Sequence, residues 1–271
     1  MFKNETKTVA LVIATYKSPR SLRLVLESVL EQSILPNQIS IADDGSGKST
    51  KAVIDEFRSR FPVPVKHFWH PDDGFRKTII MNKAIAGTHC DYIIQIDGDI
   101  VLHHRFVQDH LSVAETGCYV RGSRALLSEQ KSKEWLTQGR QPKVLPYSDG
   151  IRNRFNAIWS PLFSKLITKK SHRSDNVIGC NLAFWKSDFV KVNGYNNDLK
   201  GWGHEDIELA ARFVYSGLVQ KKVKMRAVCY HLYHPYYERN RETVNYRIYE
   251  DTLLKGRTYC SNGYHKVHSY Q

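Results

Sequence analysis

Short apolar runs alternate with amphipathic stretches along the first hundred residues. Four apolar runs rich in β-branched residues each predict a buried strand, over 9–15, 38–42, 65–69 and 91–96. Between these runs, apolar residues recur at helical spacing and predict helices that begin at Ser18 and that cover 49–61 and 76–86. Strands that alternate with helices of this length predict an α/β fold, with a mostly parallel sheet and helices on both faces.

The pattern loosens after Val120. Residues 128–175 are rich in Lys, Arg, Ser and Gln, and they predict a helix, a long loop and some disorder. Ordered structure is predicted again over 177–185 and 187–192, followed by a helix over 204–216, a strand over 223–233 and a helix near 242–255.

Charge and cysteine usage narrow the class of protein. The chain has 40 Lys and Arg against 27 Asp and Glu, a net charge of +13, so nucleic acid, anionic lipid and phosphorylated glycan are all partners to consider. The N-terminal apolar run 9–13 is too short for a signal-peptide core, and no run reaches the roughly 20 residues that span a bilayer. Five widely spaced cysteines without a CxxC pair predict reduced, buried thiols in a soluble cytoplasmic protein.

Acidic residues follow two of the predicted strands, where a parallel sheet binds its ligands. Asp97 and Asp99 flank a glycine, and two carboxylates at this spacing can share a hard divalent cation. Asp44 follows the neighbouring strand, where a carboxylate could accept a hydrogen bond from uracil or ribose. An acidic turn is the structural alternative at both places.

Residues 201–206 read Gly-Trp-Gly-His-Glu-Asp, the most informative stretch of the chain. A Trp between two glycines suggests a tight loop, and the Trp202 indole could stack on a sugar. Glu205 and Asp206 then open a helix, whose dipole is expected to favour their ionised forms. An ionised carboxylate beside a sugar could remove a proton from an acceptor hydroxyl, whereas helix capping alone would leave the Trp unexplained.

Two further segments carry candidate ligands. His231 and His234 offer imidazoles to a cation such as Mn²⁺. On one strand their rings would face opposite ways, so we expect only one of them to bind. Arg76, at the opening of the third helix, could reach a diphosphate together with Lys77, although a solvated basic turn explains the same residues.

Taken in order, these segments resemble a family 2 inverting glycosyltransferase with the GT-A (Rossmann-like) fold. The resemblance rests on six segments: Ala-Thr-Tyr at 14–16, Asp-Asp-Gly-Ser at 43–46, Asp-Gly-Phe-Arg at 73–76, Asp-Gly-Asp at 97–99, Gly-Cys-Asn at 179–181, and 201–206. The last is similar to the C-terminal motif of β1,4-galactosyltransferases and bacterial chondroitin polymerases. The resemblance implies a nucleotide-sugar half over 1–125, an acceptor and catalytic half over 126–235, and a basic, aromatic tail over 236–271.

The resemblance also implies a role for each matching position. Asp206 would be the catalytic base, and Trp202 and Glu205 would bind the acceptor sugar. A Mn²⁺ or Mg²⁺ ion would be held by Asp99 with His231 or His234. The UDP-sugar donor would contact five residues: Thr15, Tyr16, Asp44, Arg76 and Asp97. Of these, Asp97 would contact either the ribose or the metal.

Two positions depart from the family pattern. Met81 stands where an Arg usually precedes Asn82, so Lys77 or Lys83 would have to replace one diphosphate contact. His204 stands where the galactosyltransferase motif has glycine, which could alter the acceptor pocket.

The expected reaction is therefore transfer of a sugar, such as Gal, GalNAc or GlcNAc, to a glycan in bacterial surface polysaccharide or lipopolysaccharide synthesis. The basic charge suits an acceptor that is phosphorylated or lipid-linked, at the anionic inner face of the membrane. Nucleotidyl transfer to a sugar phosphate is the alternative within enzymes, but it leaves 201–206 unexplained. Nucleic-acid binding is suggested by charge alone, since no dedicated module is present and acidic strand ends repel phosphate, so no nucleic-acid partner is expected.

Overall fold

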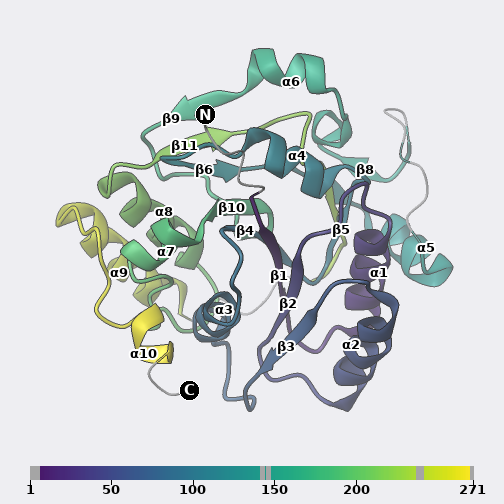
Figure 1. The fold of residues 1–271 in the computed structure, drawn as a ribbon, viewed down its shortest axis with the longest axis horizontal. Helices are drawn as coiled ribbons and strands as arrows, with labels where there is room; N and C mark the ends of the chain where they lie inside the picture. Colours follow the sequence, from purple (N-terminus) through teal and green to yellow (C-terminus); the bar gives the residue numbers. More distant parts are fainter. Residues whose placement is uncertain (1–6, 141–143, 145–147, 236–240, 269–271) are drawn as a thin grey trace.

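A computed structural model describes residues 7–140, 144, 148–235 and 241–268, and its largest feature is an eight-stranded mixed sheet (Figure 1). The strand order is β3-β2-β1-β4-β10-β6-β11-β9. The four predicted strands are parallel neighbours in one half: β1 (Val9–Thr15), β2 (Gln38–Asp43), β3 (Val65–Trp69) and β4 (Tyr92–Asp97). The other half contains β6 (Cys118–Arg121), β9 (Lys169–Ser171), β10 (Leu182–Trp185) and β11 (Val219–Lys222).

Helices cover both faces of this sheet, which confirms the predicted α/β class. Leu11 and Ile13 of β1 pack in one core with α1 (Pro19–Leu30) and α2 (Lys48–Arg60), whereas Val12 packs in another with α3 (Lys77–Ala86), α7 (Lys186–Lys191) and α8 (Glu205–Tyr215). Successive side chains of a strand point to opposite faces, so a strand buried on both sides reads as a continuous apolar run. Figure 1 shows α1 and α2 on one side of β1 and α3, α7 and α8 on the other.

A second sheet of four strands adjoins the first, in the order β5-β12-β7-β8. Its strands are β5 (Ile100–Leu102), β7 (Arg124–Leu127), β8 (Ile151–Arg152) and β12 (Cys229–His231). The segment 97–99 connects the two sheets, because β4 ends at Asp97 and β5 begins at Ile100. Ile100 pairs with His231 across β5 and β12, so the fold brings His231 next to Asp99.

The predicted strand over 223–233 is wrong in its extent. The chain forms β11 before Val223 and β12 from Cys229, with an irregular segment between them. Met225 has φ of 58° and Ala227 has φ of 49°, in the left-handed region that is incompatible with a continuous strand. This break lets the chain leave the large sheet and enter the small one.

Residues 128–175 hold more regular structure than the predicted helix and loop. The predicted helix is α5 (Glu129–Gln138), and the loop contains β8, the 3₁₀ turn Arg154–Ala157, α6 (Pro161–Ile167) and β9. Residues 141–143 and 145–147 of the expected disordered loop lie outside the described residues. Helix α4 (Phe106–Val113), which we did not predict, packs in the same core as α1 and α2.

The C-terminal residues fold onto the helical layer. The predicted helix near 242–255 is confirmed as α9 (Glu242–Leu254), which packs on α8, and α10 (Tyr264–His268) packs on α3. All five cysteines are buried and free, as predicted. Among the described helices, none is both long and apolar enough to cross a membrane.

Candidate active site

The carboxyl ends of the parallel strands bring Thr15, Asp44 and Arg76 together. Thr15 pairs with Asp43 across β1 and β2, and the Asp44 backbone N–H donates to the Thr15 carbonyl at 3.0 Å. One Asp44 carboxylate oxygen lies 2.6 Å from His70 Nε2, and the other accepts the Arg76 backbone N–H at 2.9 Å. The Thr15 hydroxyl is buried and has no hydrogen-bond partner among the described residues.

Two other predicted nucleotide contacts lie at the rim of this edge. Tyr16 is 36% exposed, and its hydroxyl lies 3.1 Å from Asp72, which also pairs with Lys17. The exposed ring is therefore accessible to a base. The Arg76 guanidinium instead contacts the Pro71 carbonyl and Asp73, so it stabilises the turn over 71–76 that precedes α3.

Asp99, His231 and His234 converge on one point. One ligand atom from each side chain lies within 4.8 Å of the others, and Asp99 Oδ2 is 3.7 Å from His231 Nε2 and 3.3 Å from His234 Nε2. The expectation that the two rings face opposite ways is wrong, because β12 ends at His231 and His234 follows in irregular backbone. Both imidazoles therefore lie beside the same carboxylate.

The chemistry of these three residues fits a divalent cation. Asp99 Oδ1 is buried and has no hydrogen-bond partner in the described part of the chain. Burial lowers the pKa of His231, which favours the neutral imidazole that binds metals. Burial also raises the pKa of Asp99, a cost that a bound cation would offset. One carboxylate and two imidazoles form a ligand set for a divalent transition-metal ion, a class that includes Mn²⁺.

Lys77 lies between the strand-end carboxylates and the start of α8. Its Nζ is 2.9 Å from Asp97 Oδ1 and 3.9 Å from Glu205 Oε1. Burial disfavours the ammonium charge, but Asp97, Asp206 and Glu205 outweigh it and keep the Lys77 pKa well above its usual value. Burial likewise acts to raise the pKa of Asp97, but Lys77 lowers it. A permanent positive charge therefore sits within reach of both halves of the site.

The departure at position 81 has a structural explanation. Met81 is fully buried in the apolar core that α3 shares with β1 and β2, so its side chain is not exposed to a ligand. Asn82 is also buried, and its amide donates to the Tyr195 carbonyl at 2.8 Å and to Asn197 at 2.9 Å. Lys77, and not the 81–82 pair, is the α3 residue that faces the carboxylates.

Asp206 is held by groups from two distant segments. Its Oδ2 accepts the Gly179 backbone N–H at 2.9 Å, and its Oδ1 lies 2.9 Å from the Tyr195 hydroxyl. That hydroxyl is also 2.8 Å from Gln95 Oε1 of β4. A Cβ at Gly179 would lie 2.2 Å from the carboxylate oxygens, so only glycine permits this close approach. The carboxylate thus has a defined position beside the strand ends.

Glu205 does not have the ionisation state expected from its place at a helix start. Burial, and after it the neighbouring Asp206 carboxylate, raise its pKa to about 7 against the opposing effect of Lys77. Glu205 is therefore only partly ionised at neutral pH, whereas the helix dipole alone predicted full ionisation. Desolvation can raise the pKa of a buried acid by several units, whereas the dipole at a helix terminus changes that pKa by less.

The loop that carries Trp202 is clamped by α9. Gly201 and Gly203 have φ of 76° and 109°, and Asn245 of α9 donates to the Gly203 carbonyl at 3.0 Å. His204 has φ of 71°, a left-handed conformation that favours the glycine of the related motif. Its ring packs edge-on against Tyr246, at 5.4 Å between centroids. His204, at the position where the related motif has glycine, thus gains an aromatic contact with α9.

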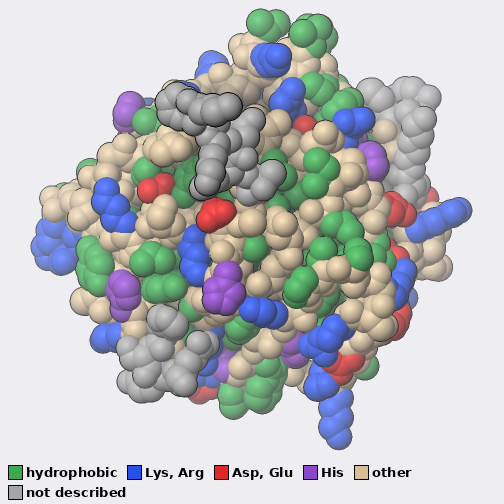
Figure 2. Space-filling model, in the orientation of Figure 1, with side chains coloured by type: hydrophobic (Ala, Val, Ile, Leu, Met, Phe, Trp, Pro, Cys, Tyr) green, Lys and Arg blue, Asp and Glu red, His purple; other side chains and the backbone are tan. Residues whose placement is uncertain are grey.

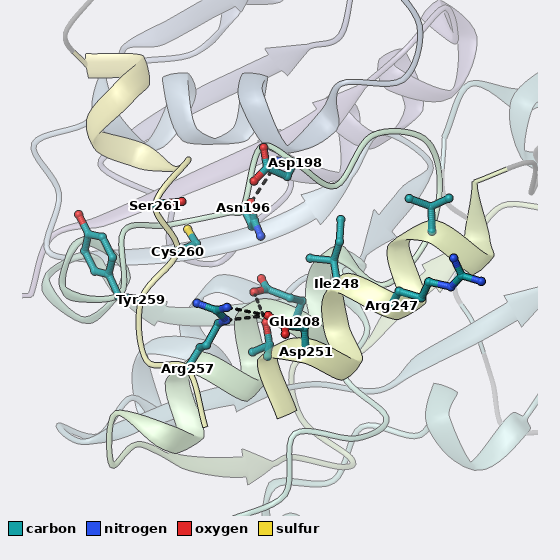
Figure 3. A pocket seen from close by; sticks show the side chains of 12 residues that line it. Asn196, Asp198, Glu208, Arg247, Ile248, Asp251, Arg257, Tyr259, Cys260 and Ser261 are labelled. Carbon is teal, nitrogen blue, oxygen red and sulfur yellow. Dashed lines mark hydrogen bonds and ion pairs between the residues drawn. The ribbon is translucent and has the colours of Figure 1, made fainter. Parts of the chain in front are cut away.

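Four residues of the site were missed by sequence analysis, namely His70, Gln95, Tyr195 and Asn245. None carries a local signal, because each acts on a segment far away in the sequence. A separate open hollow of about 670 Å³ lies between α8, α9 and residues 257–261 (Figure 3). Two of its carboxylates are in ion pairs, Glu208 with Arg212 and Asp251 with Arg257, and the third, Asp198, accepts a hydrogen bond from Asn262. None of the predicted site residues lines the hollow.

Two family models match the chain. The model described as "Glycosyl transferase family 2" matches residues 10–189, and the model described as "N-terminal domain of galactosyltransferase" matches residues 165–235. The chain is 21% identical to the chondroitin synthase of Pasteurella multocida, covering 79% of this chain and 24% of the relative. It is 22% identical to the chondroitin synthase of Escherichia coli, covering 82% and 34%. The chain therefore spans about a quarter to a third of the length of these relatives.

A solved structure shares the fold. GalNAc-T7 with UDP, GalNAc and Mn²⁺ superimposes with a TM-score of 0.64 at 14% identity, covering 93% of this chain and 51% of that one. At this identity the likeness concerns the fold alone. It confirms the predicted GT-A architecture.

Proposed function

Because this chain belongs to glycosyl transferase family 2 and is a glycosyltransferase, we propose that it transfers Gal, GalNAc or GlcNAc from a UDP-sugar to a glycan, with inversion. The observation that carries this proposal is the position of Lys77. It contacts Asp97 at the strand ends and lies 3.9 Å from Glu205 at the start of α8. The donor-side and acceptor-side carboxylates of the predicted site are therefore neighbours, as sugar transfer between two bound ligands requires.

Asp206 is the proposed base. Its carboxylate would take the proton of an acceptor hydroxyl as that oxygen bonds to the anomeric carbon of the donor and the bond from this carbon to UDP breaks. Attack from the side opposite UDP inverts the anomeric configuration. The Gly179 N–H and the Tyr195 hydroxyl hold the carboxylate in one orientation, which supports its use as a positioned base.

On the donor side, Thr15, Tyr16 and Asp44 are proposed to hold the uridine, and Lys77 to face the diphosphate. Asp99, His231 and His234 would hold a Mn²⁺ or Mg²⁺ ion, which when bound would neutralise charge on the diphosphate leaving group. The convergence of their ligand atoms within 4.8 Å supports this assignment. The Mn²⁺ in the GalNAc-T7 structure, on the same fold, adds support.

On the acceptor side, Trp202 and Glu205 are proposed to bind the sugar that receives the new linkage. The relatives named chondroitin synthases support a carbohydrate acceptor, and we propose synthesis of a bacterial surface polysaccharide or lipopolysaccharide as the setting.

Product analysis tests the proposal against nucleotidyl transfer. The purified chain is first screened by thermal shift with UDP-sugars in the presence and absence of Mn²⁺, because a ligand that binds the native state raises the melting temperature. The stabilising donor is then incubated with candidate glycans, and free UDP and free pyrophosphate are measured. We expect UDP to be released together with a glycan longer by one sugar. Release of pyrophosphate without glycan extension would contradict the proposal.

A further inference from the structure

Helix α6 exposes the side chains that a surface helix normally buries. Leu162, Phe163 and Leu166 are 72%, 60% and 77% exposed, whereas the small polar Ser164 is the residue of α6 that is buried, at 1%. Phe155, in the 3₁₀ turn just before α6, is 79% exposed. A helix on a soluble surface packs its apolar side chains inward, so an outward apolar cluster marks a contact site.

The same segment is strongly basic. Residues 150–174 contain six Lys and Arg and no Asp or Glu. Arg154, Lys170 and Arg173 each contact a carboxylate from outside this segment. For Lys165 and Lys169, no carboxylate of the described residues lies within ion-pair distance. At the top of the view in Figure 2, hydrophobic and basic side chains lie together over the place of α6.

Further positive charge lies at the adjoining edge of the large sheet. Lys169 of β9 pairs with Lys222 of β11, although like charges opposite one another destabilise a sheet. Burial lowers the pKa of Lys222, and the nearby charges of Arg121, Lys224 and Lys169 lower it further. An anionic counterpart would relieve this repulsion.

We propose that α6 and its basic flank form a docking surface for an anionic lipid bilayer. Phe163 and its apolar neighbours would enter the boundary between headgroups and acyl chains, while Lys165 and Lys169 contact lipid phosphates. A second copy of this chain fits less well, because a symmetric contact would place the same basic patch on both sides. A soluble polyanion would match the lysines and leave the apolar cluster in water.

The position of this surface adds a consequence for the site. The segment that leads into α6 begins at β8, which lies in the same small sheet as β12 and His231. Docking through α6 would therefore give the site a defined orientation to the membrane. The inference concerns where the chain works, and it does not depend on which sugar is transferred.

Vesicle flotation of the full chain tests the surface. The probes are phosphatidylcholine vesicles with and without phosphatidylglycerol. The apolar variant is Phe163→Ser/Leu166→Ser, with Leu254→Ser as its control, because Leu254 is 82% exposed at the end of α9. The charge variant is Lys165→Gln/Lys169→Gln, with Lys133→Gln in α5 as its control.

We expect the wild-type chain and both controls to bind only the vesicles with phosphatidylglycerol. The apolar variant should bind at least tenfold less. The charge variant should bind about 25-fold less, because each lysine near an anionic surface contributes about fivefold. Wild-type protein that fails to bind, or variants that bind as well as wild type, would overturn the proposal. A wild-type dimer that the apolar variant dissociates would also overturn it, in favour of self-association.

Solution activity separates this inference from the proposed chemistry. All variants should keep their melting temperature and their release of UDP with a soluble acceptor, because the substituted side chains are exposed and lie outside the site. Normal UDP release without vesicle binding by the wild type would refute the docking surface alone.

Discussion

Replacing Glu205 by Gln should stabilise the fold at pH 8 and have little effect on stability near pH 4.5. The pKa of Glu205 rises from its ordinary value of 4.5 to about 7 in the folded chain. Between these pH values the folded state binds a proton that the unfolded state has lost. The free energy of unfolding therefore falls as the pH rises from 4.5 to about 7. Each pKa unit corresponds to about 1.4 kcal/mol, which makes the cost of ionising Glu205 about 3 kcal/mol, complete above pH 7.

Urea unfolding at a series of pH values measures this cost. The difference in free energy of unfolding between Glu205→Gln and wild type should grow from near zero at pH 4.5 to about 3 kcal/mol at pH 8. Gln keeps an oxygen that can accept the Gly203 N–H, so the variant tests charge more than hydrogen bonding. Glu250→Gln on the exposed face of α9 is the matched control for the substitution itself. If the difference in free energy of unfolding between Glu205→Gln and wild type stayed constant from pH 4.5 to 8, desolvation could not be the main cause of a raised Glu205 pKa.

Three further substitutions test separate parts of the account. Asp206→Asn should lower kcat by about 10²- to 10⁴-fold and leave UDP affinity unchanged by calorimetry, because it removes the base alone; wild-type turnover would exclude that role. Tyr195→Phe should lower kcat about tenfold with the donor KM unchanged, since it removes one hydrogen bond to the carboxylate; an altered donor KM with normal kcat would contradict this. His204→Gly should be about 1 kcal/mol more stable than His204→Ala in urea, because Ala keeps the left-handed strain; equal stabilities would argue against strain.

The parts of the site that local sequence predicted are those that depend on local chemistry. The strands before Asp44 and Asp97 were predicted because buried parallel strands read as apolar runs that end in turn residues. The tight loop around Trp202 was predicted because glycines flank this residue, and both glycines have positive φ in the structure. Patterns of this kind lie within a few residues of the side chains they position.

The errors arose where distant segments decide the outcome. Asp206 owes its orientation to Gly179 and Tyr195, and the pKa of Glu205 is set mainly by burial, which no helix-terminus rule describes. Both imidazoles reach Asp99 because β12 stops at His231, after a segment broken at Met225 and Ala227, so period-two alternation no longer applies. The polar composition of 128–175 likewise concealed α6 and its exposed apolar side chains.

Calorimetric titration of Mn²⁺ into the chain with bound UDP tests the central claim most directly, with Asp99→Ala and His231→Ala as variants. We expect the wild type to bind one Mn²⁺ ion and each variant to bind it with at least tenfold weaker affinity, whereas UDP binding in the absence of metal should change little. Equal Mn²⁺ affinity in wild type and Asp99→Ala would contradict the claim that these side chains hold the cation.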